Sequence, residues 1–209
     1  MYIILISILF CVLYTAMVLV FIVGWRRVPL FEPVENINLY SGLSVSVVIA
    51  CKDEETNLPK LLSCLQIQSY QHFELILVND HSSDATMSVM EAARVLFLNI
   101  KVIDAELCGK KNALKEGIMA AAGSLIVTTD ADCVPGLNWL KTICSFQQSQ
   151  PCDLIICPVQ LTDRKSLFAK LQALEFKTLI ASGGGAAGVG MPILCNGANL
   201  AFTREAWMQ

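Results

Sequence analysis

The sequence contains few of the residue patterns from which metal-binding and disulfide frameworks are usually built. It has only two histidines, His72 and His81, and its nine cysteines include no C-x-x-C pair and none at ligand spacing from a histidine. This excludes the zinc-finger type of spacing, and we expect the histidines to be loop residues, too few to build a metal site. We expect the cysteines to be reduced and mostly buried cytosolic thiols.

Basic residues are too few to indicate a nucleic acid as a partner. The 15 Lys and Arg residues are outnumbered by 18 Asp and Glu residues, and the pI is near 5.4. Nucleic-acid-binding domains are typically basic, so we exclude this class of partner. The sequence also has no internal repeat and no low-complexity tract. Its 209 residues are enough for one domain of ordinary size with a buried core.

Charge is absent from the first part of the chain. Residues 2–25 contain no charged side chain. As a helix they would span about 36 Å, more than the roughly 30 Å of a bilayer core, so we predict a transmembrane helix over residues 1–25. A cleaved signal peptide is the alternative, but its basic leading segment, shorter apolar core and small-residue cleavage site are not evident. A buried core helix is a further alternative that so long an uncharged run disfavours.

Positive charge follows the apolar run and does not precede it. Arg26 and Arg27 come directly after it, and no Lys or Arg comes before it. The positive-inside rule then predicts a single-pass protein of the cell membrane whose main domain is cytoplasmic and whose amino terminus lies outside. Residues 26–42 contain Pro29 and Pro33 and no periodic pattern, which predicts a juxtamembrane linker.

The remainder, residues 43–209, alternates between apolar strand patterns and helical patterns. We predict strands near residues 44–50, 73–79, 99–103, 124–130 and 153–159, with helices between them. This alternation is typical of an α/β fold with a mostly parallel sheet and helices on both faces. We therefore interpret residues 43–209 as one domain.

A glycine-rich run resembles a dinucleotide-binding fingerprint by its letters. Residues 183–188 fit the pattern G-x-G-x-x-G. The fingerprint needs a strand directly before it, whereas this run follows a helical pattern over residues 167–180. We expect a flexible loop here instead.

An acidic pair is the most informative feature of the predicted domain. Asp130 and Asp132 follow the apolar residues 125–127. Because residues i and i+2 of a strand project to the same face, the two carboxylates can converge on one hard cation. Mg²⁺ or Mn²⁺ accepts one or two protein carboxylates and fills its other positions with water and phosphate oxygens. The pair predicts a divalent metal site with a pyrophosphate ligand, or it only caps the turn at residues 135–139.

Two more acidic clusters follow predicted strands, at residues 51–55 and 79–84. In open α/β sheets, ligands bind outside the carboxyl ends of the strands. All three acidic clusters are expected at that edge.

The order of these segments resembles the family 2 glycosyltransferases, which transfer a sugar from a nucleotide donor with inversion. The resemblance covers about residues 44–206. It is carried by residues 47–55 (VVIACKDEE), 78–86 (VNDHSSDAT), 109–114 (GKKNAL), 130–132 (DAD) and 196–202 (NGANLAF). The sequence departs from the family at Ala50, where Pro is common, and at Asp53, where Asn is common. The resemblance implies the GT-A fold, which is Rossmann-like, and hexosyltransferase activity.

The resemblance also implies roles for individual residues. Asp80 matches the position that recognises the nucleotide base or ribose, with an N-cap for the helix near Ser83 as the alternative. Glu54 matches an acidic position on the uracil side, so the expected donor is a UDP-sugar. Asp53 and Glu55 are interpreted as solvated or capping charges. His81 lies inside this acidic strand end and is expected near the nucleotide.

Further implied roles concern the donor diphosphate. Lys110 stands at a helix start, where a cation gains nothing from the helix dipole, so we expect it to pair with donor phosphate or ribose, the alternative being a solvated lysine. Asp132 is expected to ligate the metal directly, and Asp130 to contact the ribose or the metal through water. Asn196, Gly197 and Asn199 are expected in a donor and acceptor loop.

The family's general base is an Asp in a Glu-Asp motif that follows the segment matching residues 196–202. No such motif occurs before Gln209, so the catalytic base is expected beyond Gln209 and the chain is interpreted as an amino-terminal fragment. Glu175 is a poor substitute by its position. The Gln-x-x-Arg-Trp element of the polysaccharide-building members is also absent.

Three hypotheses follow from the sequence. The first is a membrane-anchored glycosyltransferase with a nucleotide-sugar donor and a lipid-linked or polysaccharide acceptor in cell-envelope glycan synthesis. The second is a non-catalytic nucleotide-sugar-binding or scaffold protein. The third is a receiver-like phosphate-handling module, which explains neither Lys110 nor residues 196–202.

Overall fold

The computed structural model describes residues 1–28, 30–31, 43–162 and 166–209. Most of the predicted linker over residues 26–42 therefore lies outside the described residues. The chain divides into two compact units, one formed by residues 1–31 and 158–196 and the other by residues 32–157 and 197–209. The division into a membrane helix, a linker and one domain over residues 43–209 stays a prediction.

The first unit contains two long helices, α1 (Tyr2–Arg27) and α6 (Leu167–Gly188). Helix α1 extends two residues past the predicted boundary, and in length and composition it is suited to cross a membrane. Its side chains are almost all exposed, which fits a helix that is apolar on every side and not a core helix.

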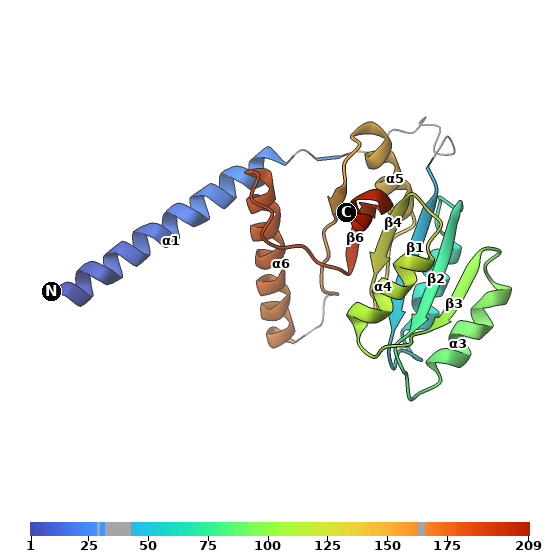
Figure 1. Ribbon diagram of the computed structural model, residues 1–209. Coiled ribbons are helices and arrows are strands. Elements are labelled where there is room, and N and C mark those ends of the chain that lie inside the picture. Colours follow the sequence, from blue (N-terminus) through green and yellow to red (C-terminus); the bar gives the residue numbers. More distant parts are fainter. Residues whose placement is uncertain (29, 32–42, 163–165) are drawn as a thin grey trace. The chain divides into compact units, whose positions relative to one another are not determined.

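The glycine run at residues 183–188 is the last part of α6, so the expectation of a flexible loop there is wrong. The reason is close packing of α6 on α1 (Figure 1). A Cβ atom added to Gly185 would collide with the backbone of Phe21, and one added to Gly188 would collide with the backbone of Gly24. The glycines allow the two helix backbones to approach each other.

The second unit is built on a six-stranded sheet with the strand order β3-β2-β1-β4-β6-β5 (Figure 1). The strands are β1 (Val45–Cys51), β2 (Phe73–Asn79), β3 (Ile100–Asp104), β4 (Leu125–Thr129), β5 (Leu154–Ile156) and β6 (Asn199–Thr203). Strands β1 to β4 are parallel, and β6 is antiparallel to β4 and β5. The five predicted strands are confirmed, whereas β6 was missed. This order differs from the 2-1-3-4-5 order of receiver-like modules.

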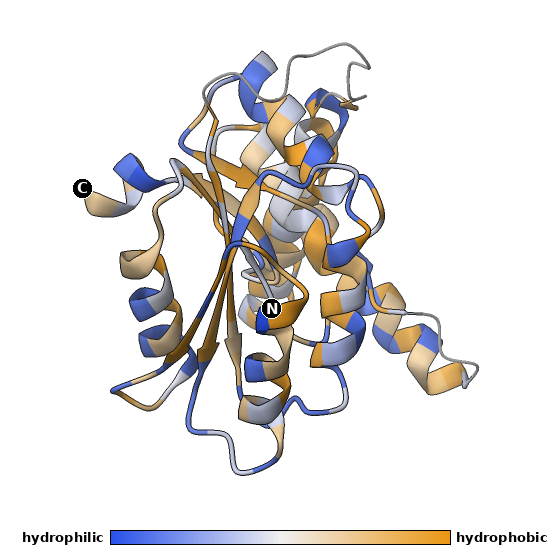
Figure 2. Cartoon of the chain, turned by 90° about the vertical axis from the view of Figure 1, so that its right-hand side faces the viewer, coloured by the Kyte–Doolittle hydropathy of each residue, from blue (hydrophilic) through white to orange (hydrophobic). Residues whose placement is uncertain are grey.

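Helices cover both faces of this sheet, as predicted. They are α2 (Leu58–Gln66), α3 (Thr86–Ala92) with the 3₁₀ turn η1 (Ala93–Val95), α4 (Lys110–Ala120), α5 (Trp139–Ser149) and the short α7 (Arg204–Met208). Apolar side chains of α2, α3 and α5 form one core with the sheet, and those of α4 form a second core on the opposite face. Figure 2 shows the hydrophobic strands between these helices and the more hydrophilic loops at the sheet edges. Two-sided burial explains why β1 and β2 are almost continuous apolar runs.

Buried polar groups fix the amino-terminal edge of the sheet. The Glu74 carboxylate on β2 accepts hydrogen bonds from the Ser46 hydroxyl and from the backbone N–H groups of Ala122 and Gly123, and its other oxygen lies 3.1 Å from Lys101 Nζ. Desolvation raises the pKa of Glu74, but these partners outweigh it and hold the pKa below its usual range. The network joins β1, β2, β3 and the loop that leads into β4.

Candidate functional site

The carboxyl ends of β1, β2 and β4 bring the three acidic clusters to one edge of the sheet. In the parallel register Cys51 is paired with Asn79, and Val48 is paired with Thr128. The backbone N–H of Asp80 donates to the carbonyl of Cys51 over 2.8 Å, which joins the loops after β1 and β2. The predicted common edge is therefore present.

Three acids in these loops hold the loops to each other. Asp53 Oδ1 accepts from the backbone N–H and the hydroxyl of Ser83 at 2.7 and 3.0 Å. The Glu55 carboxylate accepts a hydrogen bond from the backbone N–H of Ala85 over 2.9 Å. The Asp84 carboxylate accepts one from the backbone N–H of Glu55 over 3.1 Å. Asp53 has a positive φ of 54°, a conformation that Asp tolerates better than most residues. These contacts support capping and bracing roles for Asp53 and Glu55.

Asp84 also bonds locally to Thr86, the first residue of helix α3. Its Oδ1 accepts from the backbone N–H of Thr86 over 2.9 Å and from the Thr86 hydroxyl. Partial desolvation raises the pKa of Asp84, but the hydrogen bonds from Thr86 and from the Glu55 amide outweigh it and lower the pKa. The N-cap residue of α3 is Ala85, without a side-chain cap hydrogen bond, so the capping alternative considered for Asp80 is wrong.

Glu54 lies at the same edge, between the loop after β1 and helix α3. Its backbone N–H donates to Thr86 Oγ1 over 2.7 Å, and its Oε2 accepts from Asn57 Nδ2 over 2.8 Å. The side chain is neither fully buried nor fully exposed. A carboxylate held in this way is available to a ligand at the edge.

Asp80 is a buried acid that reaches from β2 to helix α4. Its side chain is only 4% exposed, and its Oδ1 accepts from the backbone N–H of Gly109 over 2.6 Å. Gly109 has φ of +112° and is the N-cap residue of α4, and glycine adopts such a conformation without steric cost. Asp80 is therefore fixed in orientation at the start of α4.

Lys110 has a partner that the sequence did not indicate. Its Nζ lies 2.6 Å from Asp130 Oδ1, and the two side chains are 57% and 30% exposed. The ion pair gives the lysine a reason to stand in the first turn of α4, where the helix dipole does not favour it. It also joins the loop after β4 to α4.

Asp132 is the more accessible member of the acidic pair. It is exposed, whereas Asp130 is partly buried and is engaged with Lys110. Asp132 Oδ1 lies 3.9 Å from Cys133 Sγ, and burial raises the pKa of that thiol. Two carboxylates at the end of a strand provide the oxygen donors that Mg²⁺ or Mn²⁺ takes in proteins. The residues present thus fit a hard divalent cation, with Asp132 open to it and Asp130 available if Lys110 moves.

The segment 197–199 runs beside the end of β4. The carbonyl of Gly197 accepts from Thr128 Oγ1 over 2.9 Å, and the carbonyl of Ala198 lies 3.9 Å from Cys133 Sγ. Asn199 Oδ1 accepts from Trp139 Nε1 over 2.8 Å, so this amide supports α5. Gly197 and Asn199 are thus near the acidic pair, while Asn196 falls in the other unit.

The cysteines are all free thiols, but the expectation that most are buried is wrong. Only Cys51 and Cys144 are fully buried. Burial raises the pKa of each to about 12, so these two are inert packing groups. Cys11, Cys108 and Cys195 are exposed.

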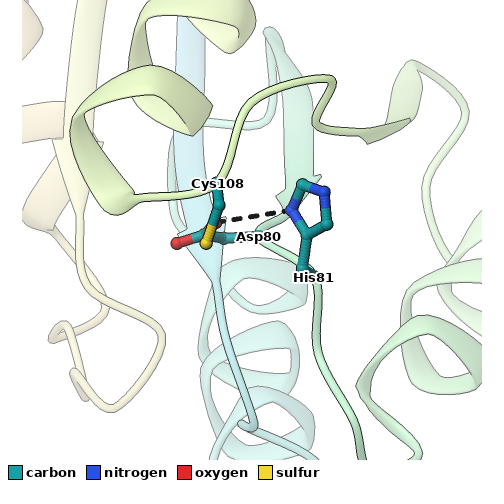
Figure 3. Close-up of side chains that lie close together, drawn as sticks. All are labelled: Asp80, His81 and Cys108. Atoms are coloured by element: carbon teal, nitrogen blue, oxygen red, sulfur yellow. Dashed lines mark ion pairs between the residues drawn. The ribbon is translucent and has the colours of Figure 1, made fainter.

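One group of side chains at this edge was missed by the sequence reasoning. Ligand atoms of Asp80, His81 and Cys108 lie within 4.8 Å of one another, and this is the one such group of three among the residues that the structure describes. Figure 3 shows the three side chains pointing toward one another from the loops after β2 and before α4. Spacing rules fail here because Cys108 is 27 residues from His81 in the sequence.

Comparison with known proteins is consistent with this geometry. Poly-beta-1,6-N-acetyl-D-glucosamine synthase of Staphylococcus epidermidis is 28% identical over 138 residues, which cover 65% of this chain and 33% of the relative. Undecaprenyl-phosphate 4-deoxy-4-formamido-L-arabinose transferase of Proteus mirabilis is 41% identical over 95 residues, which cover 42% of this chain and 28% of the relative. The chain thus spans about a third of the length of these relatives.

Solved structures confirm the GT-A fold. Mannosyltransferase PcManGT from Pyrobaculum calidifontis, in complex with GDP-Man and Mn²⁺, aligns with a TM-score of 0.67 and 20% identity over 92% of this chain and 53% of its own. S. aureus TarS in complex with UDP aligns with a TM-score of 0.53 and 24% identity over 59% of this chain and 38% of its own.

The sequence family described as Glycosyl transferase family 2 matches residues 46–198. These residues include all of β1 except Val45, the whole of β2 to β5, and all three acidic clusters. This match extends over most of the chain, and we conclude that the protein belongs to glycosyltransferase family 2.

Proposed function

We propose that this protein is a membrane-anchored glycosyltransferase that uses a UDP-sugar donor and a lipid-linked or polysaccharide acceptor in cell-envelope glycan synthesis. The observation that carries the proposal is that Asp80, the Lys110–Asp130 ion pair and Asp132 all lie at the carboxyl ends of the parallel strands or at the start of the adjoining α4. This edge is where open α/β sheets bind ligands. The relatives support the substrate class, since one is named as a poly-beta-1,6-N-acetyl-D-glucosamine synthase and the other as an undecaprenyl-phosphate 4-deoxy-4-formamido-L-arabinose transferase.

In the proposed complex the nucleoside lies over the loops after β1 and β2. The Asp80 carboxylate is already oriented by the Gly109 N–H, which binds Oδ1, and the proposal assigns its other oxygen to the base or ribose. Glu54 supplies a second carboxylate on this side. Hydrogen bonds to a charged acceptor contribute about 1.5–3 kcal/mol each, so these two groups are sufficient to select a nucleoside.

The diphosphate is proposed to lie over the loop after β4. Asp132 and Asp130 would hold Mn²⁺ or Mg²⁺, which when bound neutralises charge on the departing diphosphate. Lys110 sits 2.6 Å from Asp130, so its ammonium is at hand for a phosphate oxygen once the metal takes over the carboxylate. Gly197 and Asn199, beside β4, are proposed to border the sugar and the acceptor.

The membrane arrangement is part of the proposal. Helix α1 would be the single transmembrane anchor, residues 26–42 the juxtamembrane linker and residues 43–209 the catalytic domain. Two arginines end α1, which supports a cytoplasmic location for that domain under the positive-inside rule.

The experiment is calorimetry of UDP binding to the full chain in detergent, with Mn²⁺ and with a chelator in its place. We expect tighter binding with Mn²⁺ because the cation bridges Asp132 and the diphosphate. In Asp132→Ala the UDP affinity should fall to the value that the unmutated chain has with the chelator, and it should no longer change when Mn²⁺ is added.

The matched control is Asp153→Ala. Asp153 is an exposed carboxylate whose backbone carbonyl accepts from Thr203 at the opposite end of β6, so its loss should leave the Mn²⁺ dependence intact. Equal UDP affinity with and without Mn²⁺ in the unmutated chain would contradict the proposed metal role.

A further inference from the structure

We propose that Asp80, His81 and Cys108 form a binding site for a soft divalent cation of the Zn²⁺ class, and that a cation there blocks the nucleoside pocket. The site is separate from the carboxylate pair after β4, which suits hard cations. Metal binding at this site stands on geometry alone, whereas the blocking effect rests on the proposed function of Asp80.

The composition of the cluster suits Zn²⁺. One carboxylate, one imidazole and one thiol are the three ligand types that Zn²⁺ takes in proteins, at bond lengths of about 2.0–2.3 Å. Three protein ligands leave a fourth tetrahedral position for water or a ligand. Mg²⁺ and Mn²⁺ prefer oxygen ligands, so the thiol and imidazole select against them.

The distances between the ligand atoms of the cluster are close to those of a tetrahedral metal site. Tetrahedral bonds of that length place ligand atoms about 3.3–3.8 Å apart. His81 Nδ1 already lies 3.7 Å from Asp80 Oδ1, and all three ligand atoms lie within 4.8 Å of one another. Closing the set needs movements of about 1 Å, which the exposed side chains of His81 and Cys108 can make by small rotations.

The Asp80 carboxylate of the cluster is fixed in orientation, and the other two ligands, His81 and Cys108, are accessible. Asp80 is buried and accepts from Gly109 N over 2.6 Å, an outer hydrogen bond of the kind that orients metal ligands. His81 has φ of 55°, and its ring points at Asp80 as Figure 3 shows. A cation can therefore enter from solvent and meet a preset carboxylate.

The neighbouring side chain of Lys52 opposes cation binding at the cluster. Lys52 Nζ lies 3.8 Å from Cys108 Sγ, and its positive charge would repel a cation at the thiol. The lysine is exposed and has a long flexible side chain, so it can turn into solvent. Removing this charge should tighten metal binding.

The consequence for the enzyme follows from Asp80. A cation ligated by Asp80 takes up the carboxylate oxygens that the proposed nucleoside contact needs. Zn²⁺ would then compete with the donor, while Mn²⁺ at the acidic pair would assist it. Two cations would have opposite effects at two positions along one sheet edge.

The test uses Co²⁺ as a spectroscopic probe on the full chain in detergent. A cobalt–thiolate bond gives a charge-transfer band in the near ultraviolet, which oxygen and nitrogen ligands do not give. We expect this band at one equivalent of Co²⁺, and we expect Zn²⁺ to abolish it by displacement. Cys108→Ser should remove the band, and Cys195→Ser, which changes another exposed thiol, should keep it.

The other two ligands and the opposing lysine are tested by affinity. His81→Ala should weaken Co²⁺ binding by more than the roughly 10- to 100-fold that loss of an outer hydrogen bond costs, and Lys52→Gln should tighten it. No band in the unmutated chain, or the same band in Cys108→Ser, would overturn the metal site.

The blocking effect is measured with uridine, which lacks phosphates and does not chelate the probe. Saturating uridine should lower the apparent Co²⁺ affinity, and Zn²⁺ should lower uridine affinity in the unmutated chain but not in Cys108→Ser. A cobalt band that does not respond to uridine would support the metal site and refute the blocking effect. Mn²⁺-dependent UDP binding without any cobalt band would refute the metal site and leave the proposed function standing.

Discussion

At the scale of single residues, the structure distinguishes acids that hold the loops together from two acids that do not join these loops. Asp53, Glu55 and Asp84 accept hydrogen bonds across the loops after β1 and β2. Asp80 and Asp132 differ from them, because Asp80 is buried and accepts from the Gly109 N–H at the start of α4, and Asp132 is exposed after the end of β4. The five acids look alike in sequence, and only their partners distinguish them.

Residue types and their order predicted the edge but not the pairings within it. Strand ends can be placed from apolar runs, so the positions of Asp80, Asp130 and Asp132 followed from the sequence. The Lys110–Asp130 ion pair joins residues 20 apart, and the approach of Cys108 to His81 depends on the loop before α4. Such contacts depend on loop paths, which no local periodicity encodes.

Glu74 carries a prediction about pH. The folded pKa of Glu74 is below its ordinary value of 4.5 because hydrogen bonds and Lys101 outweigh desolvation. The unfolded chain therefore binds the proton more readily, so the stabilisation is present above about pH 4.5 and is lost as the pH falls through the folded pKa.

We expect Glu74→Gln to lower the free energy of unfolding at neutral pH by about 1.5–3 kcal/mol, since a charged hydrogen-bonding partner is lost. Below pH 4.5 the difference between the variant and the unmutated chain should shrink. Urea unfolding followed by tryptophan fluorescence measures the free energy of unfolding at neutral pH and below pH 4.5. The exposed Glu91→Gln is the control, and we expect it to have little effect. A difference that does not change with pH would argue against the ionised network.

At the scale of secondary-structure elements, the contact of α4 with the sheet positions both Gly109 and Lys110. Gly117 in α4 faces the sheet, where an added Cβ would lie 2.5 Å from a methyl of Val48 and 2.9 Å from one of Val78. The absence of a side chain lets the helix come close. This close approach sets the height of the helix start above the strand ends.

We expect Gly117→Val to destabilise the second unit by roughly 1–3 kcal/mol, since overpacking forces the helix away from the sheet. UDP affinity should fall together with stability, because the displaced helix moves Lys110 and the Gly109 N–H away from their positions at the sheet edge. Met119→Val, an exposed change in the same helix, tests for the effect of β-branching alone and should be nearly neutral. A Gly117→Val variant as stable as Met119→Val would show that the helix does not depend on this contact.

Element prediction failed where packing or strand pairing between distant segments decided the outcome. The glycine run of α6 has a loop-like composition, yet packing on α1 keeps it helical. Strand β6 (Asn199–Thr203) overlaps residues 196–202, which are interpreted from the sequence as a donor and acceptor loop. Its antiparallel pairing with β4 and β5 is a property of the sheet and not of the segment.

At the scale of the whole molecule, the fold class and the apolar first helix followed from composition and alternation. The parallel strands β1 to β4 are buried on both faces, and such strands are recognisable as apolar runs. The grouping of residues 158–196 with α1 was not foreseen. That grouping depends on contacts between distant segments.

The proposed topology predicts an asymmetry in protease access. In inverted membrane vesicles, protease should digest the domain that follows α1, and in sealed right-side-out spheroplasts it should spare it, because Arg26 and Arg27 are retained on the cytoplasmic side. Immunoblotting with a carboxyl-terminal tag measures this. Digestion in spheroplasts and protection in vesicles would mean the opposite orientation, and release of the intact chain by an alkaline wash would argue against an anchor.

The central claim is that one sheet edge binds a nucleoside diphosphate in two parts, with the nucleoside at Asp80 and the diphosphate at Asp132. The most direct measurement is calorimetry of uridine and of UDP with Mn²⁺ on the full chain, on Asp80→Ala and on Asp132→Ala. Asp80→Ala should weaken uridine and UDP alike, by roughly 10- to 150-fold for the loss of one charged hydrogen bond. Asp132→Ala should weaken UDP far more than uridine. Uridine affinity that is the same in Asp80→Ala and in the unmutated chain, or equal losses of UDP and uridine in Asp132→Ala, would contradict the account.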